Sequence, residues 1–287
     1  MSTYTNALEI KKLTKSFKEF KLDDINLTLP GGCIMGLIGE NGAGKSTLIR
    51  LILDMLHKDS GTVTVLGKDN GDNLKLTKEE IGVVTDEIGI PECLNAKQVG
   101  KIMKHTFKSW DEKNYKNYLV KLAIPDNKQF KDFSRGMKMK LGIAVALSHG
   151  SKLLLLDEAT SGLDPVVRDE VVDMFGDFTR DETHSILLSS HIVSDLEKIC
   201  DYIAFLHKGK LLLCEEKDRL LEEYGIVRCE CERLKELDPK SILNKKVTPY
   251  GAEAVVLRNA VPQGVNISPI SIEELFVHMV KEERSNG

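Results

Sequence analysis

The stretch that decides the fold is GENGAGKST, residues 39–47. The apolar segment CIMGLIG (33–39) precedes it and is typical of a buried strand, whereas GKSTLIRLILDML (44–56) follows with apolar residues at helical spacing. A glycine-rich loop between a strand and a helix is the context that the phosphate-binding pattern G-x-x-x-x-G-K-[ST] requires. An accidental glycine-rich turn is the alternative, but it does not explain this context. The sequence therefore predicts a phosphate-binding loop in an α/β fold.

Each part of this loop has a chemical role in holding phosphate. Gly39, Gly42 and Gly44 let the backbone turn tightly and point its N–H groups inward, and the following helix N-terminus favours negative charge. Lys45 supplies a positive charge to the β- and γ-phosphates, and Ser46 offers a hydroxyl to Mg²⁺. The other loop residues expected to bind the nucleotide are Glu40, Asn41, Ala43 and Thr47.

Two further apolar segments end in polar residues. KLLLLDEA (152–159) places Asp157 and Glu158 at the end of a buried strand, and HSILLSSH (184–191) ends in His191. In a parallel sheet these ends face the same crevice as the phosphate-binding loop. Asp157 can hold Mg²⁺, Glu158 can polarise an attacking water, and His191 is expected near the γ-phosphate. The alternatives are two acids that cap the next helix and a structural histidine.

The chain alternates strands and helices in most of its length. Apolar strands in this alternation predict a mostly parallel sheet that is covered on both faces. Short strands are expected in 8–17 and 25–32, and GTVTVLG (61–67) has the alternation of an edge strand. Residues from about 90 to 149 are expected to form helices, and residues 221–287 a small α+β unit.

Composition excludes several classes of protein. The net charge is −4 with 29% charged residues, so there is no basic excess to indicate nucleic-acid binding. No uncharged apolar run approaches the roughly 18 residues of a membrane span, and the N-terminus lacks the apolar core of a signal peptide. We expect a cytosolic chain with reduced cysteines that are mostly buried or half-buried, at positions 33, 93, 200, 214, 229 and 231.

The order of the motifs resembles the ATPase subunit of an ATP-binding cassette (ABC) transporter. After the phosphate-binding loop come a helical insert, FSRGM (133–137), the acid pair, SGLD (161–164) and the strand-end histidine, and the resemblance covers about residues 7–220. FSRGM takes the place of the family signature LSGGQ. The resemblance implies a P-loop NTPase fold: a RecA-like core with a mostly parallel sheet, an antiparallel β subdomain and a helical subdomain at about 90–149. The C-terminal α+β extension is expected as an accessory region after residue 220.

The resemblance also implies a site shared between two subunits. Ser134 and the N–H of Gly136 are expected to contact the ATP of the opposite subunit, while Ser161 and Asp164 belong to a loop that crosses the dimer. Phe17 corresponds to the aromatic residue that stacks on adenine. A plain helix cap at Ser134 and a core position for Phe17 are the alternatives.

Three positions that the family uses for its site depart from its pattern. Arg135 replaces the first glycine of the signature, and Met137 replaces its glutamine. Asp86 stands where the family has a glutamine that contacts Mg²⁺ and the membrane partner, and an acid there can also coordinate Mg²⁺. A non-catalytic regulatory subunit is therefore an alternative to an active ATPase.

The function implied by the resemblance is ATP hydrolysis that powers a separate membrane exporter. The expected ligands are ATP and Mg²⁺, and the expected partners are a second ATPase subunit and an integral membrane subunit, without nucleic acid. The protein would lie on the inner face of the cell membrane through that partner. The sequence is similar to the branch that exports bacitracin and amphipathic peptides, and SIEELF (271–276) fits its C-terminal extension. A soluble ABC ATPase acting on ribosomes or DNA is the alternative, which a single cassette with a short insert disfavours.

Overall fold

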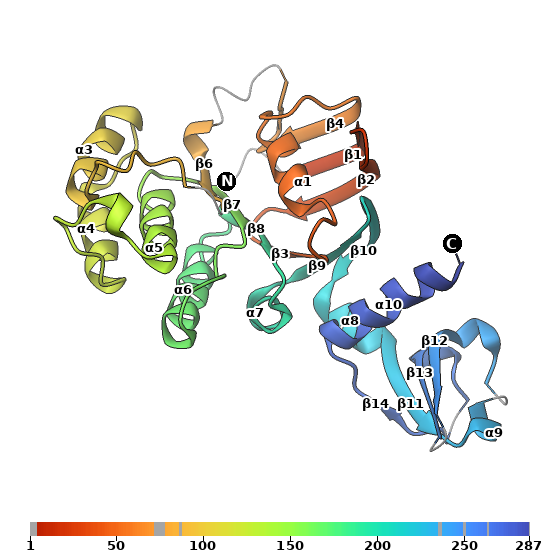
Figure 1. Ribbon diagram of the computed structural model, residues 1–287. Coiled ribbons are helices and arrows are strands. Elements are labelled where there is room, and N and C mark those ends of the chain that lie inside the picture. Colours follow the sequence, from red (N-terminus) through yellow and green to blue (C-terminus); the bar gives the residue numbers. More distant parts are fainter. Residues whose placement is uncertain are drawn as a thin grey trace.

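The computed structural model describes residues 5–71, 78–85, 88–234, 237–248, 251–262 and 264–286, which form three sheets (Figure 1). The central sheet has the strand order β10-β9-β3-β8-β7-β6, and every pairing in it is parallel except that of β9 with β10. Its strands are β3 (Ile34–Ile38), β6 (Ile81–Val84), β7 (Leu153–Asp157), β8 (Ser185–Ser190), β9 (Tyr202–His207) and β10 (Lys210–Glu216).

Of the four inner strands, β3, β7 and β8 are buried at every residue, as expected for a parallel sheet covered on both faces. Alternate leucines of β7 face different layers. Leu153 and Leu155 belong to the apolar cluster that includes α1 (Lys45–Ile52), whereas Leu154 and Leu156 belong to the opposite cluster. The predicted arrangement is therefore confirmed.

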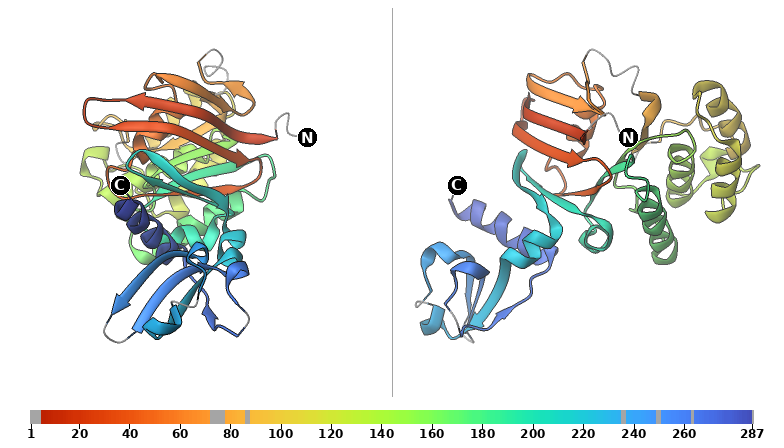
Figure 2. Two further views of the ribbon diagram at one scale, coloured as in Figure 1. Left: turned by 90° about the vertical axis from the view of Figure 1, so that its right-hand side faces the viewer. Right: turned by 180° about the vertical axis from the view of Figure 1, so that it is seen from behind.

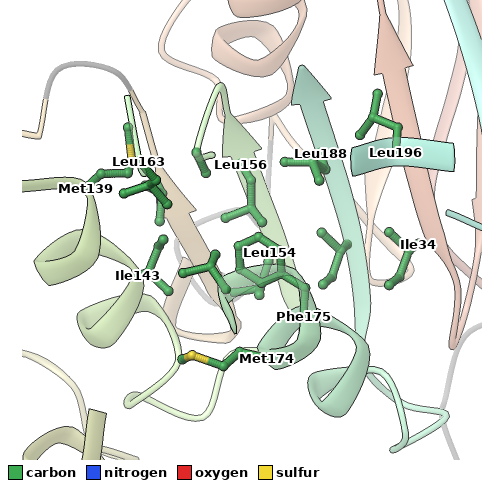
Figure 3. Packing of buried hydrophobic residues seen from close by; sticks show 14 of the residues in the cluster. Ile34, Met139, Ile143, Leu154, Leu156, Leu163, Met174, Phe175, Leu188 and Leu196 are labelled. Atoms are coloured by element: carbon green, nitrogen blue, oxygen red, sulfur yellow. The ribbon is translucent and has the colours of Figure 1, made fainter. Parts of the chain in front are cut away.

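The second layer of the core is built by helices from later in the chain. Figure 3 shows Leu154 and Leu156 of β7 packed near Phe175 of α6 (Pro165–Phe178). Helix α5 (Arg135–Ala146) adds Met139 and Ile143 to the same cluster, and α7 (Val193–Ile199) adds Leu196. The carboxyl ends of the parallel strands β3 and β7 lie at one edge of the central sheet.

The antiparallel sheet has the order β2-β1-β4-β5. Its strands are β1 (Asn6–Ser16), β2 (Lys21–Pro30), β4 (Ser60–Val65) and β5 (Lys68–Asp69). The predicted edge position of β4 is wrong, because the two-residue β5 pairs with its outer side. This sheet joins the central one where the N–H of Asp23 donates to the carbonyl of Gly209 at 2.8 Å.

The helical subdomain predicted for residues 90–149 contains α3 (Ala96–Thr106), α4 (Glu112–Lys121) and α5. Asn95 and Gln98 form a reciprocal capping box at the start of α3, and Asp111 caps α4. The buried hydroxyl of Tyr115 donates to the carbonyl of Ala96 at 2.8 Å and ties the two helices together. Short 3₁₀ turns occur at Lys78–Glu80 and Phe130–Asp132.

In the described residues, the C-terminal unit is a sheet of order β12-β13-β11-β14 with three helices, and it lies at the opposite end of the molecule from α3 and α4 (Figure 2). Its elements are α8 (Lys217–Glu223), β11 (Tyr224–Cys229), α9 (Cys231–Leu234), β12 (Ile242–Thr248), β13 (Gly251–Leu257), β14 (Ile267–Ser268) and α10 (Ile272–Asn286), with 3₁₀ turns at Pro239–Ser241 and Arg258–Ala260.

Helix α10 packs both on the C-terminal sheet, where Asn244 of β12 donates to the carbonyl of His278 at 3.0 Å, and on the core. The ring of Phe276 lies 5.2 Å from that of Phe205 in β9, centroid to centroid. The N–H of Ile272 donates to Glu197 in α7 at 3.3 Å. The segment SIEELF is thus a docking segment for the C-terminal unit.

All six cysteines are free thiols, and burial raises the pKa of those of Cys33, Cys200 and Cys214. Cys93 is exposed. Within the described ranges, no helix is both long and apolar enough to cross a membrane.

Candidate functional site

The phosphate-binding loop has the backbone that its glycines predict. Gly42 and Gly44 have φ of +81° and +110°, a region that favours glycine. A β-carbon at Gly44 would lie 2.7 Å from Cζ of Phe20, and one at Gly39 would lie 2.5 Å from the carbonyl oxygen of Leu206. Gly44 is also the N-cap of α1, so this cap has no side chain to fill the helix N-terminus. The open N-terminus can therefore accept an anion.

Lys45 is held inside the loop. Its side chain is only 6% exposed, and its ammonium donates to the carbonyl of Gly39 at 2.8 Å. The same ammonium lies 3.4 Å from a carboxylate oxygen of Glu158. A buried lysine with a fixed direction is a positive charge already placed where phosphate must bind.

The acid pair lies at the end of β7, and Ser189 of β8 organises it. Asp157 is 5% exposed and accepts a hydrogen bond from the Ser189 hydroxyl at 2.6 Å. The N–H of Glu158 donates to the carbonyl of Ser189 at 3.1 Å. Glu158 has φ of +54°, an uncommon conformation for a residue with a side chain. Ser189 thus holds the carboxylate of Asp157 and the backbone of Glu158.

His191 follows β8 directly and contacts the second acid. Its Nδ1 atom lies 2.5 Å from Oε2 of Glu158, while Oε1 of Glu158 faces Lys45. The carboxylate of Glu158 therefore lies between two basic side chains. The structure brings together these three residues, which the sequence placed in one crevice.

A cavity of about 570 Å³ opens beside these groups. Nine of the predicted residues line it: Glu40, Asn41, Gly42, Gly44, Lys45, Ser46, Thr47, Glu158 and His191. Phe20, Arg135 and Ser161 line it as well. Ala43 is buried and is not among the lining residues, and its N–H donates to the carbonyl of Glu40 within the loop at 3.0 Å.

The residues predicted to face the opposite subunit lie at helix starts. Ser134 is exposed and caps α5 by accepting from the N–H of Met137 at 3.3 Å. Asp164 is exposed and caps α6 by accepting from the N–H of Val167 at 3.1 Å. A β-carbon at Gly136 would lie 3.0 Å from the carbonyl oxygen of Gly162, so the start of α5 packs closely on this loop.

Two aromatic rings lie near the mouth of the cavity. Phe17 is 43% exposed, and its ring centroid is 6.2 Å from that of Phe20. Phe20, which the sequence analysis missed, lines the cavity itself. The sequence feature that could have indicated Phe20 is its position three residues after Phe17. Stacking of adenine on Phe17 stays a prediction.

The residues present fit a magnesium ion bound together with a nucleotide. Ser46 and the buried Asp157 offer the oxygen ligands that Mg²⁺ prefers. In the described part of the chain, no three His, Cys, Asp or Glu side chains gather as a metal site. Phosphate and water oxygens would complete the coordination around Ser46 and Asp157. Asp86, the third predicted ligand, lies outside the described residues.

Comparison with known proteins agrees with this geometry. A family model described as "ABC transporter" matches residues 22–161. The lantibiotic transport ATP-binding protein SrtF of Streptococcus pyogenes is 35% identical over 214 residues, which span 74% of this chain and 91% of that protein. The chain belongs to the ABC transporter family. As predicted, this ABC protein is the ATP-hydrolysing subunit of a transporter.

Other relatives extend the similarity. The bacitracin transport ATP-binding protein BcrA of Enterococcus faecalis is 34% identical over 71% of this chain and 68% of its own. The ABC transporter ATP-binding protein YtrB of Bacillus subtilis is 28% identical over 94% of this chain and 97% of its own. The match to YtrB is long enough to include part of the C-terminal unit.

Solved structures support the fold of this ABC subunit. An ATP-binding subunit of an ABC transporter superposes with a TM-score of 0.65 at 24% identity, over 75% of this chain and 91% of that chain. A dimeric ATP-binding cassette in a post-hydrolysis state with ADP and Pi gives the same TM-score at 19% identity, over 73% and 98% of the two chains. The predicted P-loop NTPase fold is confirmed.

Proposed function

We propose that this subunit pairs head-to-tail with a second ATPase subunit around two ATP–Mg²⁺ and thereby drives a separate integral membrane exporter. The observation that carries this proposal is the position of Glu158 between Lys45 and His191 at the mouth of the phosphate-binding loop. The protein would lie on the inner face of the membrane through that membrane partner. Its helical subdomain would receive the partner's coupling segments.

The residues of one chain account for binding and for activation of water. The loop N–H groups and Lys45 hold the phosphates, and the buried position of Lys45 keeps its charge in place before ATP arrives. Glu158 orients an attacking water and takes its proton, while His191 fixes the carboxylate and reaches toward the γ-phosphate. Bound Mg²⁺, held by Ser46 and Asp157, would neutralise charge that develops on the phosphate oxygens.

The second half of the reaction centre would come from the partner. Ser134 and the N-terminus of α5 are exposed in a single chain and offer a hydroxyl and N–H groups to a γ-phosphate across the interface. Closure of the pair would pull on the membrane subunit, and hydrolysis would reopen it.

We propose a peptide antimicrobial as the cargo. The names of two relatives support this class: one is a lantibiotic transport ATP-binding protein and the other a bacitracin transport ATP-binding protein. This chain would bind ATP, and the cargo would bind the membrane subunit.

The substitution Glu158→Gln tests the proposal. It removes the base but keeps the shape of the side chain, so ATP binding should persist and the closed dimer should accumulate. Turnover should fall by about 100-fold or more, since a positioned general base contributes about 10²–10⁴-fold. Phosphate release and sedimentation with ATP measure the two effects.

Glu170→Gln, an exposed position on α6, is the matched control and should keep normal turnover. Normal turnover in Glu158→Gln would contradict the proposal.

A further inference from the structure

Arg135 occupies an unexpected place beside the phosphate-binding loop of its own chain. It is the first residue of α5, between Ser134 and Gly136, yet it lines the same cavity as Lys45 and Glu158. Its aliphatic stem lies against the loop that leads into α6. A β-carbon at Gly162 would be 3.5 Å from Cδ and 3.8 Å from Nε of Arg135. The exposed side chain thus packs on the loop at Gly162 and borders the cavity of its own subunit, as well as a smaller cavity beside Lys138.

The negative charge in the cavity favours a second phosphate-binding cation beside Lys45. Two carboxylates, of Glu40 and Glu158, share the cavity with Lys45, and the ammonium of Lys45 lies 3.4 Å from Glu158. A triphosphate adds several negative charges at this point. A guanidinium is always charged and offers a planar set of donors that matches phosphate oxygens, so Arg135 suits this task better than a lysine.

We propose that Arg135 is a phosphate-binding residue of the site in its own subunit and contacts the terminal phosphate of ATP. The inference rests on the proposed function only in taking ATP as the ligand. The start of α5 would then contact two nucleotides. Ser134 and Gly136 would contact the ATP of the partner subunit, whereas Arg135 would contact the ATP of its own subunit. The same side chain would hold α5 against the loop at Gly162 when ATP is bound.

This role predicts discrimination between ATP and ADP by a single chain. A residue that contacts the terminal phosphate contributes to the affinity for ATP and not to that for ADP. Arg135→Gln shortens the side chain but keeps its carbons as far as Cδ, the atom nearest Gly162, and removes the charge. We expect it to weaken ATP binding about tenfold and ADP binding less than twofold. Arg135→Lys should fall between Arg135→Gln and the unchanged chain for ATP.

The test is a titration of the full chain with fluorescent ATP and ADP analogues, at a concentration where sedimentation shows monomers. Lys138→Gln is the matched control, because Lys138 lies one turn along α5, with its ammonium 4.9 Å from the Phe130 ring, in a neighbouring cavity of about 280 Å³. This control should leave both affinities unchanged. Unchanged ATP affinity in Arg135→Gln, or equal losses for ATP and ADP, would overturn the inference.

Dimers of two different variants distinguish a role of Arg135 in its own subunit's site from a role in the partner's site. In each mixed dimer, one chain carries Lys45→Ala, so ATP binds at the phosphate-binding loop of the other chain, which keeps Lys45. Arg135→Gln is then introduced either into the Lys45→Ala chain or into the chain that keeps Lys45. ATP affinity should fall only when Arg135→Gln is in the chain that keeps Lys45. A loss only in the other placement would assign Arg135 to the partner's site. If Lys45→Ala alone kept full ATP affinity, the proposed function itself would fail.

Discussion

The phosphate-binding loop and the start of α5 differ in how completely one chain builds them. Lys45 is 6% exposed and contacts both Gly39 and Glu158. Ser134, by contrast, is exposed, and its hydroxyl oxygen is used for capping its own helix. One region is preorganised by internal contacts, whereas the other presents a helix N-terminus at the surface.

This difference explains why a single chain should bind ATP well and hydrolyse it poorly. Binding uses groups that are already in place, and their positions cost no further reorganisation. Hydrolysis would also need donors from the exposed helix start of a second subunit. The following substitutions probe the two regions separately.

Lys45→Ala should have the largest effect, and it acts on the preorganised region. It removes the buried cation and leaves Glu158 without the ammonium that lies 3.4 Å away. ATP affinity should fall by about 100-fold, as expected for loss of a charge-assisted contact to phosphate. A nucleotide titration measures it, with the exposed Lys101→Ala on α3 as the control. An ATP affinity unchanged within twofold would show that Lys45 does not bind phosphate.

Ser134→Ala should have an intermediate effect, and it acts on the exposed region. Turnover of the dimer should fall about tenfold, since one hydrogen bond to the transition state is lost. ATP affinity of the monomer should not change. The loss of the helix cap should also cost about 1 kcal/mol of unfolding free energy.

Asn95→Ala is the matched control for the cap, because Asn95 caps α3 in the same subdomain. It should lower stability by a similar amount without changing turnover. If both variants kept equal ATPase rates, Ser134 would be a helix cap and no more.

Phe276→Ala should have the smallest effect on the site. The half-buried ring packs on Phe205, so its loss should lower the free energy of unfolding by about 2 kcal/mol. ATP affinity should stay within twofold, because α10 contacts the core away from the cavity. Thermal unfolding and nucleotide titration measure the two quantities. A tenfold loss of ATP affinity would mean that the C-terminal unit takes part in binding.

The sequence predicts the preorganised region better than its surroundings, for physical reasons. Gly39 to Thr47 and the acid pair combine fixed spacing with buried strands, so a local pattern suffices to find them. Ser189 could not be found in this way, because its role depends on its register beside Asp157 in a neighbouring strand. Phe20 is similar, since it reaches the loop through space at Gly44.

The C-terminal unit was predicted less completely. Strand β12 was missed because Lys245, Lys246 and Val247 are successive exposed residues, which interrupt the alternation that marks a half-buried strand. The docking of α10 was missed because its partners, Phe205 and Glu197, lie more than 70 residues earlier in the chain.

The central claim is that neither chain alone contains a complete reaction centre. The most direct measurement is ATP turnover per subunit as a function of protein concentration, with the unchanged chain and Ser134→Ala side by side. The account predicts that turnover per subunit rises steeply with concentration and that Ser134→Ala lowers its plateau. Turnover that is constant down to monomer concentrations and equal in both proteins would contradict it.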